Sequence, residues 1–392
     1  DNGTMMYDEE PSTPTTPPPP QSLTFIEGVK DIVDRYDVFI IDMWGVMHDG
    51  TTPYEGVIDT IQQLVRKNNN SENNIGIEKK KKLIILSNSG KRLNMSKKSL
   101  MKLGFDPEND FFQIITSGDV GHRMLSGENS STLLCSTWDL LDKHCNSTNN
   151  GSKIERKNVF VFGSGDSDEE YVASCGWTLC TNIEKANLIL ARGAFTIYSD
   201  NGNGNAEDVT VISKHQDESL YNTVLEATFE KASKLQIPML ITNPDKVRPT
   251  EGLPPMPGAL GDAYEKYLGP IASTSSGRKD SFCHPLVKRI GKPFTEVYDI
   301  ALASCGSDRS RVIMVGDSLE TDITGATRSN IDTLWVVNNG VHAPSVKELM
   351  NQQNGAEYET CVKSVLDGFN DKMNYTGNKR LHPTFVAKHF QW

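Results

Sequence analysis

Short runs of apolar residues alternate with amphipathic stretches along most of the chain. Each run is about as long as a strand that is buried on both faces of a sheet. The runs predict strands at 37–42, 82–87, 158–162, 187–191, 238–242, 311–316 and 332–337. The amphipathic stretches predict helices at 55–66, 94–103, 166–174, 219–235, 258–268, 293–304 and 345–351. This alternation of strand and helix is typical of an α/β fold.

The length of the chain, 392 residues, exceeds what one ordinary hydrophobic core accommodates, so two domains are expected. The outer strands carry the candidate chemical residues, whereas the middle of the chain has its own alternation of strands and helices. We therefore expect one domain that is interrupted by another. The predicted core is discontinuous, with residues 23–106 and 255–392, and the predicted inserted domain is 107–254.

Segments rich in Pro, Asn, Gly and Ser predict stretches without regular structure. Residues 1–22, which include the run Pro17–Pro20, are expected to form a disordered tail. The segments 68–74, 146–152 and 201–205 are expected to be surface loops.

Composition and charge limit the expected partners. The formal net charge of −11 argues against nucleic acid. No apolar run approaches the length that spans a membrane, so no membrane partner is expected. The seven cysteines are scattered and lack CxxC spacing, which disfavours a zinc site or a disulfide framework. They indicate an intracellular, reducing compartment, either the cytoplasm or an organelle lumen such as that of a plastid.

Two of the predicted strands end at a carboxylate. Asp42 closes the strand 37–42, and Asp317 follows the strand 311–316, with Asp322 five residues later. The carboxyl ends of parallel strands face the ligand crevice, so these oxygens predict a site suited to Mg²⁺. Asp42 could also attack phosphorus to give an aspartyl-phosphate. Taken singly, each aspartate is equally explained as a turn or helix-capping residue.

Two smaller signals accompany the aspartates. Ser87 and Asn88 lie where the strand 82–87 opens toward a helix, and a hydroxyl and backbone N–H groups in that position can cradle a phosphate. Lys292, in the sequence Gly291-Lys292-Pro293, precedes a predicted helix, and its ammonium could neutralise a phosphoryl oxygen. Taken singly, Ser87 and Asn88 are explained as a helix cap and Lys292 as a surface lysine. These interpretations do not explain why the aspartates, Ser87 and Lys292 all stand at strand ends or helix starts in this order.

In this order the four signals resemble the four motifs of the haloacid dehalogenase (HAD) superfamily. The resemblance implies Asp42 as nucleophile, Ser87 as phosphate-binding residue, Lys292 as the motif lysine, and Asp317 with Asp322 as the acidic motif. The stretch from Thr242 to Asp245, followed by Pro257-Gly258-Ala259 and a helix, is similar to the return from the large α/β cap of subclass IIA. The first motif, Asp42-x-Trp44-Gly45-Val46, resembles an uncharacterised branch of that subclass.

The resemblance implies a Rossmann-like core with an inserted α/β cap. It also implies a Mg²⁺-dependent phosphohydrolase that acts on a small phosphorylated metabolite through an aspartyl-phosphate. Asp42, Asp317, Asp322 and the backbone carbonyl of Trp44 would hold the metal, and Ser87, the N–H of Asn88 and Lys292 would hold the phosphoryl oxygens. Because members of the subclass often pair through the cap, a homodimer is possible.

One residue departs from the family's pattern. In its phosphatases the second residue after the nucleophile is an aspartate that protonates the leaving oxygen and later activates water, and here it is Trp44. An indole N–H is a donor only. Loss of a positioned acid–base group typically costs ~10²–10⁴-fold in rate.

Several interpretations of Trp44 stay open. The substrate could have a good leaving group, such as an acyl phosphate, or His48 or Asp49 could supply the acid–base function. Alternatively, the protein could be a slow or silent HAD-like binding protein. The dehalogenases have an aromatic residue at this position, but they work without a metal, and the pair Asp317 and Asp322 argues against that chemistry.

Two residues of the predicted cap complete the candidates. Arg192 follows the strand 187–191; it could meet an anionic group of a substrate, although a surface arginine is the better interpretation. Asp245 resembles the aspartate at the family's cap return, and we expect it to orient loops of the core or the cap.

Overall fold

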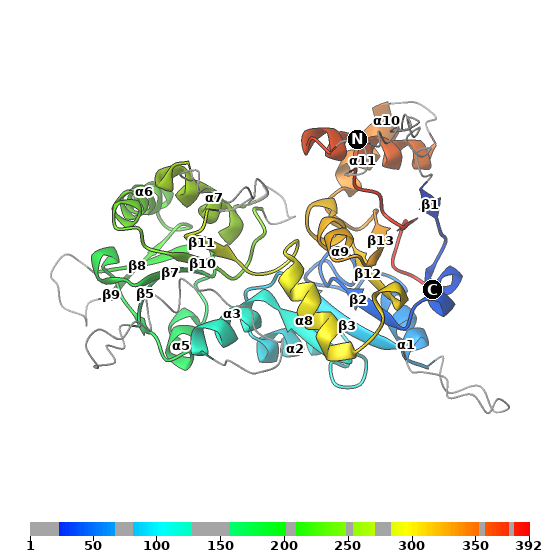
Figure 1. Cartoon of the computed structure of the whole chain (residues 1–392), viewed down its shortest axis with the longest axis horizontal. Helices are drawn as coiled ribbons and strands as arrows, with labels where there is room; N and C mark the ends of the chain where they lie inside the picture. The colour runs from blue at the N-terminus through cyan, green and yellow to red at the C-terminus, as the bar shows by residue number, and fades with distance from the viewer. Residues whose placement is uncertain are drawn as a thin grey trace, which may run out of the picture.

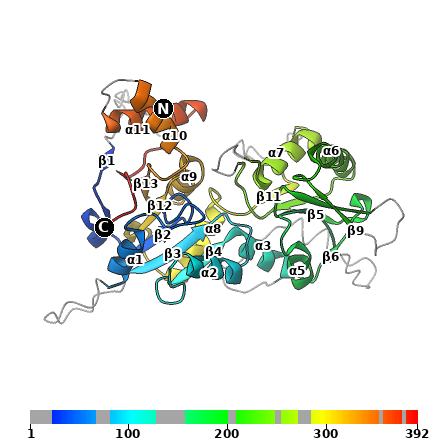
Figure 2. The same ribbon diagram turned by 180° about the vertical axis from the view of Figure 1, so that it is seen from behind.

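The structure is a computed structural model that describes residues 23–66, 81–127, 157–200, 209–247, 254–270, 284–352, 357–375 and 380–392. The predicted tail at 1–22 and the predicted loops at 68–74, 146–152 and 201–205 lie outside these residues. Figure 1 shows two lobes, each built around its own sheet, and Figure 2 shows the same arrangement from behind. Among the described helices, none is both long and apolar enough to cross a membrane.

The first lobe is a parallel sheet with the strand order β1-β14-β13-β12-β2-β3-β4. Its strands are β1 (Thr24–Phe25), β2 (Val38–Ile41), β3 (Lys82–Ser87), β4 (Gln113–Thr116), β12 (Val312–Gly316), β13 (Asp332–Val336) and β14 (Phe385–Ala387). Because β2 lies between β12 and β3, the residues that follow these three strands meet at one edge of the sheet.

Both faces of this sheet are covered, which explains why its strands read as continuous apolar runs. In β2, Val38 and Ile40 belong to one buried cluster, together with side chains of α8 such as Tyr298. The intervening Phe39 and Ile41 belong to a second cluster on the opposite face. The helices of this lobe are α1 (Val57–Arg66), α2 (Leu93–Lys102), α8 (Thr295–Cys305), α9 (Thr324–Arg328), α10 (Ala343–Gln352) and α11 (Tyr358–Lys372).

The second lobe is a mixed sheet with the order β11-β10-β7-β5-β8-β9, and β6 also pairs with β5. Its strands are β5 (Asn158–Gly163), β6 (Thr178–Leu179), β7 (Leu188–Ala191), β8 (Thr196–Asp200), β9 (Val209–Ser213), β10 (Met239–Ile241) and β11 (Val287–Arg289). The helices α5 (Asp168–Ser174), α6 (Glu218–Lys234) and α7 (Pro257–Leu268) pack around it. This lobe is the inserted cap. The helix α3 (Ser117–Ser126) is tied to it, because Tyr171 Oη donates to the carbonyl of Gly118.

The predicted α/β architecture is confirmed, and every predicted strand and helix is present within a few residues of its predicted bounds. The sheets divide the chain differently from the predicted boundaries at 107 and 255. The strand β4, inside the predicted insertion, pairs with β3 of the core, and β11, inside the predicted core, pairs with β10 of the cap. Both strands are short, and the residues that decide their sheet lie far away in sequence, so local pattern did not place them.

Candidate active site

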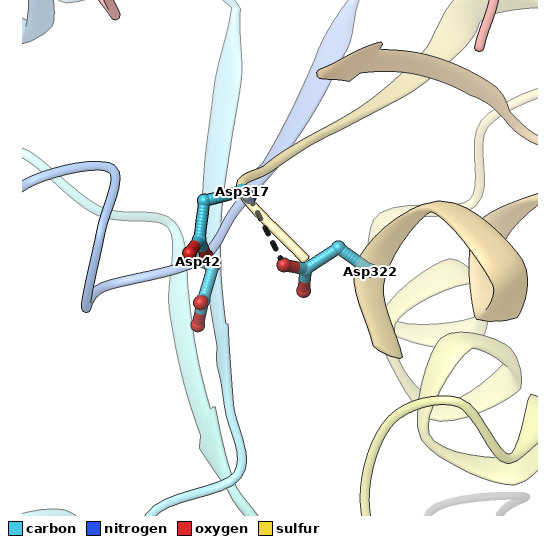
Figure 3. A group of neighbouring side chains, drawn as sticks. All are labelled: Asp42, Asp317 and Asp322. Carbon is cyan, nitrogen blue, oxygen red and sulfur yellow. Dashed lines mark hydrogen bonds between the residues drawn. The ribbon is translucent and has the colours of Figure 1, made fainter. Parts of the chain in front are cut away.

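Three carboxylates meet at the carboxyl edge of the core sheet. Asp42 directly follows β2, Asp317 directly follows β12, and these two strands are neighbours, with Val315 opposite Ile41. Asp322 comes from the turn of π-helix Leu319–Ile323 that follows Asp317. Figure 3 shows the three side chains converging, and one oxygen from each lies within 4.8 Å of the others.

Glycines make this close approach possible. Gly45 has φ = +81°, and a Cβ there would lie 2.5 Å from Cγ of Asp317. A Cβ at Gly340 would lie 2.3 Å from Cβ of Asp317, which is also closer than real side chains come. The backbone that carries Trp44 and Gly45 therefore runs directly beside the Asp317 carboxylate.

Backbone hydrogen bonds fix the two acidic-motif side chains. Asp322 Oδ2 accepts from the N–H groups of Asp317 and Ser318, each at 3.1 Å (Figure 3 draws the first). Asp317 Oδ2 accepts from the N–H of Val341 at 2.8 Å. Val341 and Gly340 lie in the turn after β13, and the sequence prediction missed them. The rule that led to Asp42 and Asp317, to inspect the residues after each apolar strand, would have found this turn after the strand 332–337.

Lys292 lies between two of the carboxylates. Its Nζ is 2.6 Å from Asp42 Oδ1 and 2.7 Å from Asp322 Oδ1, and its side chain is only 2% exposed. Burial alone would lower the pKa of Lys292, but the charges of Asp322 and Asp42 outweigh it and raise the pKa above the ordinary value. The ammonium is therefore charged where it contacts Asp42.

One ammonium does not balance three carboxylates. Burial raises the pKa of Asp42 to about 7, an effect that Lys292 opposes and Asp322 reinforces. Burial also raises the pKa of Asp317 well above its usual range, with further repulsion from Asp322 and Asp42. When all three are ionised, two negative charges remain uncompensated in a nearly closed site. Clustered carboxylate oxygens with this excess charge fit a divalent cation such as Mg²⁺.

The predicted phosphate-binding residues reach the same place. Ser87 ends β3, the other neighbour of β2, and is buried with its Oγ accepting from the N–H of Ser89 at 3.2 Å. The Asn88 side chain accepts from the N–H of Lys292 at 2.7 Å and donates to its carbonyl at 3.1 Å. Asp42, Ser87, Asn88, Lys292, Asp317 and Asp322 therefore lie at or beside the ends of the neighbouring strands β2, β3 and β12.

The segment after Asp42 is a compact turn. A Cβ at Gly50 would lie 3.1 Å from Nε1 of Trp44, which places the indole against this turn. His48 is buried, and its Nδ1 accepts from the N–H of Gly50 at 3.0 Å. The Asp49 carboxylate is exposed and bonded within its own turn, to Thr51 and Thr52, and these bonds lower its pKa. Of the two proposed replacements for the family's acid–base aspartate, Asp49 is thus engaged elsewhere.

Arg192 is not a surface residue. Its Nη1 lies 2.6 Å from Asp168 Oδ1 in an ion pair whose side chains are 4% and 0% exposed, and its guanidinium stacks 4.1 Å from the ring centroid of Tyr171. Asp168 also accepts from the hydroxyl of Tyr198 at 3.1 Å and from the N–H of Gly165 at 3.0 Å. The arginine therefore stabilises the cap, and its charge is already paired there.

Comparisons with known proteins agree with this geometry. A family model described as haloacid dehalogenase-like hydrolase matches residues 39–178, and one described as HAD-hydrolase-like matches 289–368. The first segment contains Asp42, Ser87 and Asn88, and the second contains Lys292 and the acidic pair.

Comparisons over most of the chain find phosphatase relatives and structures with the same fold. A 4-nitrophenylphosphatase of Schizosaccharomyces pombe is 24% identical over 326 residues, which are 80% of this chain and 87% of that protein. Two solved structures share the fold. A possible sugar phosphatase of the HAD superfamily from Cytophaga hutchinsonii has a TM-score of 0.56 at 17% identity and covers 93% of this chain and 98% of its own. A 4-nitrophenylphosphatase from Thermotoga maritima has a TM-score of 0.51 at 17% identity, covering 91% and 96%.

Proposed function

The chain belongs to the haloacid dehalogenase-like hydrolases, and from that membership we propose that it is a phosphatase acting on a small phosphorylated metabolite. The observation that carries the proposal is the position of the Lys292 ammonium, bonded to Asp42 and Asp322 beside a third carboxylate. A nucleophile, a fixed positive charge and a cluster of oxygen ligands at one strand edge are the parts that phosphoryl transfer requires.

In the proposed reaction an oxygen of Asp42 attacks phosphorus. The bond between phosphorus and the leaving oxygen breaks, and the departing group takes a proton from solvent or is released as a stable anion. Water then attacks the aspartyl-phosphate, which returns free Asp42 and inorganic phosphate. Lys292 favours the ionised form of Asp42 before attack, against the effect of burial, and offsets charge on the phosphoryl oxygens together with Ser87 Oγ and the N–H of Asn88.

The donor set fits a bound Mg²⁺, for which Asp42, Asp317, Asp322 and the carbonyl of Trp44 are the proposed ligands. When bound, the ion supplies positive charge that offsets the charge of the phosphoryl oxygens. The proximity of Gly45 to Asp317 supports the assignment of the Trp44 carbonyl, since that carbonyl belongs to the peptide unit leading into Gly45.

Trp44 restricts the proposed substrates to those with good leaving groups. Because the indole cannot protonate a departing alkoxide, an acyl phosphate or an aryl phosphate would react much faster than an alkyl phosphate. The Schizosaccharomyces pombe relative is named for the hydrolysis of an aryl phosphate, which supports this choice of test substrate.

The test is phosphate release and trapping with acetyl phosphate and 4-nitrophenyl phosphate. We expect release that depends on added Mg²⁺, and mass spectrometry of rapidly quenched protein should locate a phosphoryl group on Asp42. The variant Asp42→Asn should show neither. If the wild-type chain gives no release and no label with any phosphodonor, although Mg²⁺ raises its melting temperature, the protein is instead a metal-binding, non-hydrolytic member of the superfamily.

A further inference from the structure

The side chain of Asn88 has bonds that the proposed reaction does not use. It is 5% exposed, and its amide bonds to Asp245, to the backbone of Lys292 and, at 3.5 Å, to the hydroxyl of Ser117. Nδ2 donates to Asp245 Oδ1 at 2.7 Å and to the carbonyl of Lys292 at 3.1 Å, while Oδ1 accepts from the N–H of Lys292 at 2.7 Å. One amide thus holds both backbone groups of Lys292, as a neighbouring strand would.

The backbone of Lys292 lies where the chain crosses from the cap sheet to the core, so bonds that fix it to the core also fix the start of the core segment. The chain leaves the cap sheet at Arg289, the last residue of β11, and Lys292 follows three residues later. Arg289 is anchored inside the cap, to Asp262 at 3.0 Å and Glu265 at 2.7 Å. The intervening Gly291 has φ = +128°. Besides the two ion pairs of its ammonium, the bonds from Asn88 hold the backbone of Lys292 to the core at this crossing from the cap.

Asp245 favours the same orientation of the Asn88 amide as the Lys292 carbonyl does. It lies in the cap loop after β10; burial raises the pKa of its carboxyl group, the Asn88 bond and the Lys292 charge oppose that shift, and in its ionised form it can only accept hydrogen bonds. The NH₂ of Asn88 must therefore face Asp245, which turns the amide oxygen toward the N–H of Lys292. The reversed amide would set its oxygen against the Asp245 carboxylate and the Lys292 carbonyl, and its NH₂ against the N–H of Lys292, losing all three bonds.

We propose that Asn88 and Asp245 are positioning residues for Lys292: Asn88 fixes the lysine backbone to the core, and Asp245 reinforces the orientation in which Asn88 does so. Asp245 is a cap residue, so the lysine reaches its place beside Asp42 only when the cap loop is docked on the core. This inference rests on the proposed function, because it takes Lys292 as the group that neutralises the phosphoryl oxygens.

The chain offers a matched control. Asn370, in α11, holds Leu381 with the same pattern: Nδ2 donates to its carbonyl at 3.1 Å and Oδ1 accepts from its N–H at 2.6 Å. Asn370 is buried like Asn88, but its side chain bonds to Leu366 and Leu381, neither of which is a proposed site residue. The variants Asn88→Ala and Asn370→Ala therefore remove the same kind of clamp, and only one of the two clamps holds Lys292.

With 4-nitrophenyl phosphate as substrate, Asn88→Ala should lower kcat by about 10²-fold with little change in KM, the effect of a catalytic group displaced by about 1 Å. Asn370→Ala should lower the melting temperature comparably and leave kcat unchanged. The inference is overturned if Asn88→Ala retains wild-type kcat, or if Asn370→Ala loses as much kcat.

The orientation step is tested by exchange of the two side chains. Asn88→Asp sets two carboxylates against each other and should be at least as damaging as Asn88→Ala. Adding Asp245→Asn supplies an NH₂ that faces the new carboxylate, which can still accept from the N–H of Lys292. The double variant should regain kcat by roughly tenfold, the size of a typical coupling between contacting residues. A double variant no better than Asn88→Asp would show that Asp245 does not orient residue 88.

A readout independent of turnover separates this inference from the proposed function. The amide hydrogen of Lys292 should exchange with solvent deuterium faster in Asn88→Ala than in the wild type, and at the wild-type rate in Asn370→Ala. If the wild type hydrolyses no phosphodonor but this difference is seen, the function fails and the clamp stands. If the wild type is active and the exchange rates are equal, the clamp fails and the function stands.

Discussion

The ammonium of Lys292 lies 2.6 Å from the nucleophile candidate Asp42, on a segment that reaches the core directly from the cap sheet. The same ammonium lies 2.7 Å from Asp322, so it compensates part of the charge of the acidic pair as well as contacting the candidate nucleophile. We therefore expect Lys292 to affect both stability, through charge compensation, and activity, through Asp42. A bound Mg²⁺ should replace the charge compensation but not the contribution to activity.

Replacement of Lys292 by Met should separate these roles. It leaves three buried carboxylates without a cation, and loss of one partner from a buried ion pair typically costs about 3–5 kcal/mol. We expect a metal-free variant destabilised by that amount, and a rise in melting temperature on adding Mg²⁺ that is larger than the rise in the wild type. Activity should stay lost at saturating Mg²⁺.

The control for this prediction is Asp317→Asn, which removes a proposed metal ligand and keeps Lys292. Its melting temperature should respond little to Mg²⁺, whereas a ligand present at 100 times its Kd stabilises a native protein by about 2.7 kcal/mol. Equal responses to Mg²⁺ in the wild type and in both variants would show that the cation does not bind among these carboxylates.

Trp44→Asp should increase activity. The variant places a group that can donate and accept a proton at the position where the family's phosphatases have their acid–base aspartate. Such groups contribute roughly 10²–10⁴-fold. The gain in kcat should be at least about 10²-fold for an alkyl phosphate such as glycerol phosphate, and smaller for 4-nitrophenyl phosphate, whose leaving group needs little protonation.

Trp44→Leu is the matched control for that gain, since it removes the indole without adding an acid. If Trp44→Leu gains as much as Trp44→Asp, the indole acts by excluding substrate, and the missing acid is not what limits turnover.

The convergence of the candidate residues on one edge of the sheet has a simple physical cause. Asp42, Ser87 and Asp317 each follow a buried strand, and parallel pairing alone brings the ends of adjacent strands to one edge. Their proximity therefore follows from local pattern and topology. The order of the strands was not predicted, and the structure supplies it, with β2 between β12 and β3.

What the sequence did not predict depends on contacts between distant segments. Arg192 was assigned to the surface because most arginines are exposed, and its burial depends on Asp168 and Tyr198 arriving from two other elements. The side-chain bonds of Asn88 also depend on distant segments, since Asp245 follows β10 and Lys292 follows β11. No local sequence pattern at Arg192 or Asn88 predicts these partners.

Close packing against Asp317 predicts a specific intolerance at Gly45. Any residue other than glycine at φ = +81° costs about 1–2 kcal/mol, and a Cβ here would also lie 2.5 Å from the Asp317 carboxyl carbon. Gly45→Ala should therefore be both destabilised and inactive, because the carboxylate must move.

Gly176→Ala is the control: it has φ = +73° but no neighbouring atom within 4 Å, so it should lose only the backbone part and keep full activity. Chemical denaturation and Mg²⁺-dependent phosphate release measure the two effects, and an active Gly45→Ala variant would contradict the packing argument.

The buried pair of Arg192 and Asp168 should stabilise the cap without taking part in catalysis. Arg192→Met leaves the Asp168 carboxylate unpaired in a site with no exposure, so we expect a loss of about 3–5 kcal/mol in the free energy of unfolding. Adding Asp168→Asn removes the stranded charge and should recover part of that loss.

Lys234→Met is the control. It breaks an equally short pair, with Glu230 at 2.6 Å, on the exposed face of α6, and should cost about 0–1 kcal/mol. Hydrogen–deuterium exchange should show the Arg192→Met effect in β5 and β7 but not in β2. If instead KM for an anionic substrate rises while stability is unchanged, Arg192 binds substrate and its pairing with Asp168 is not the resting arrangement.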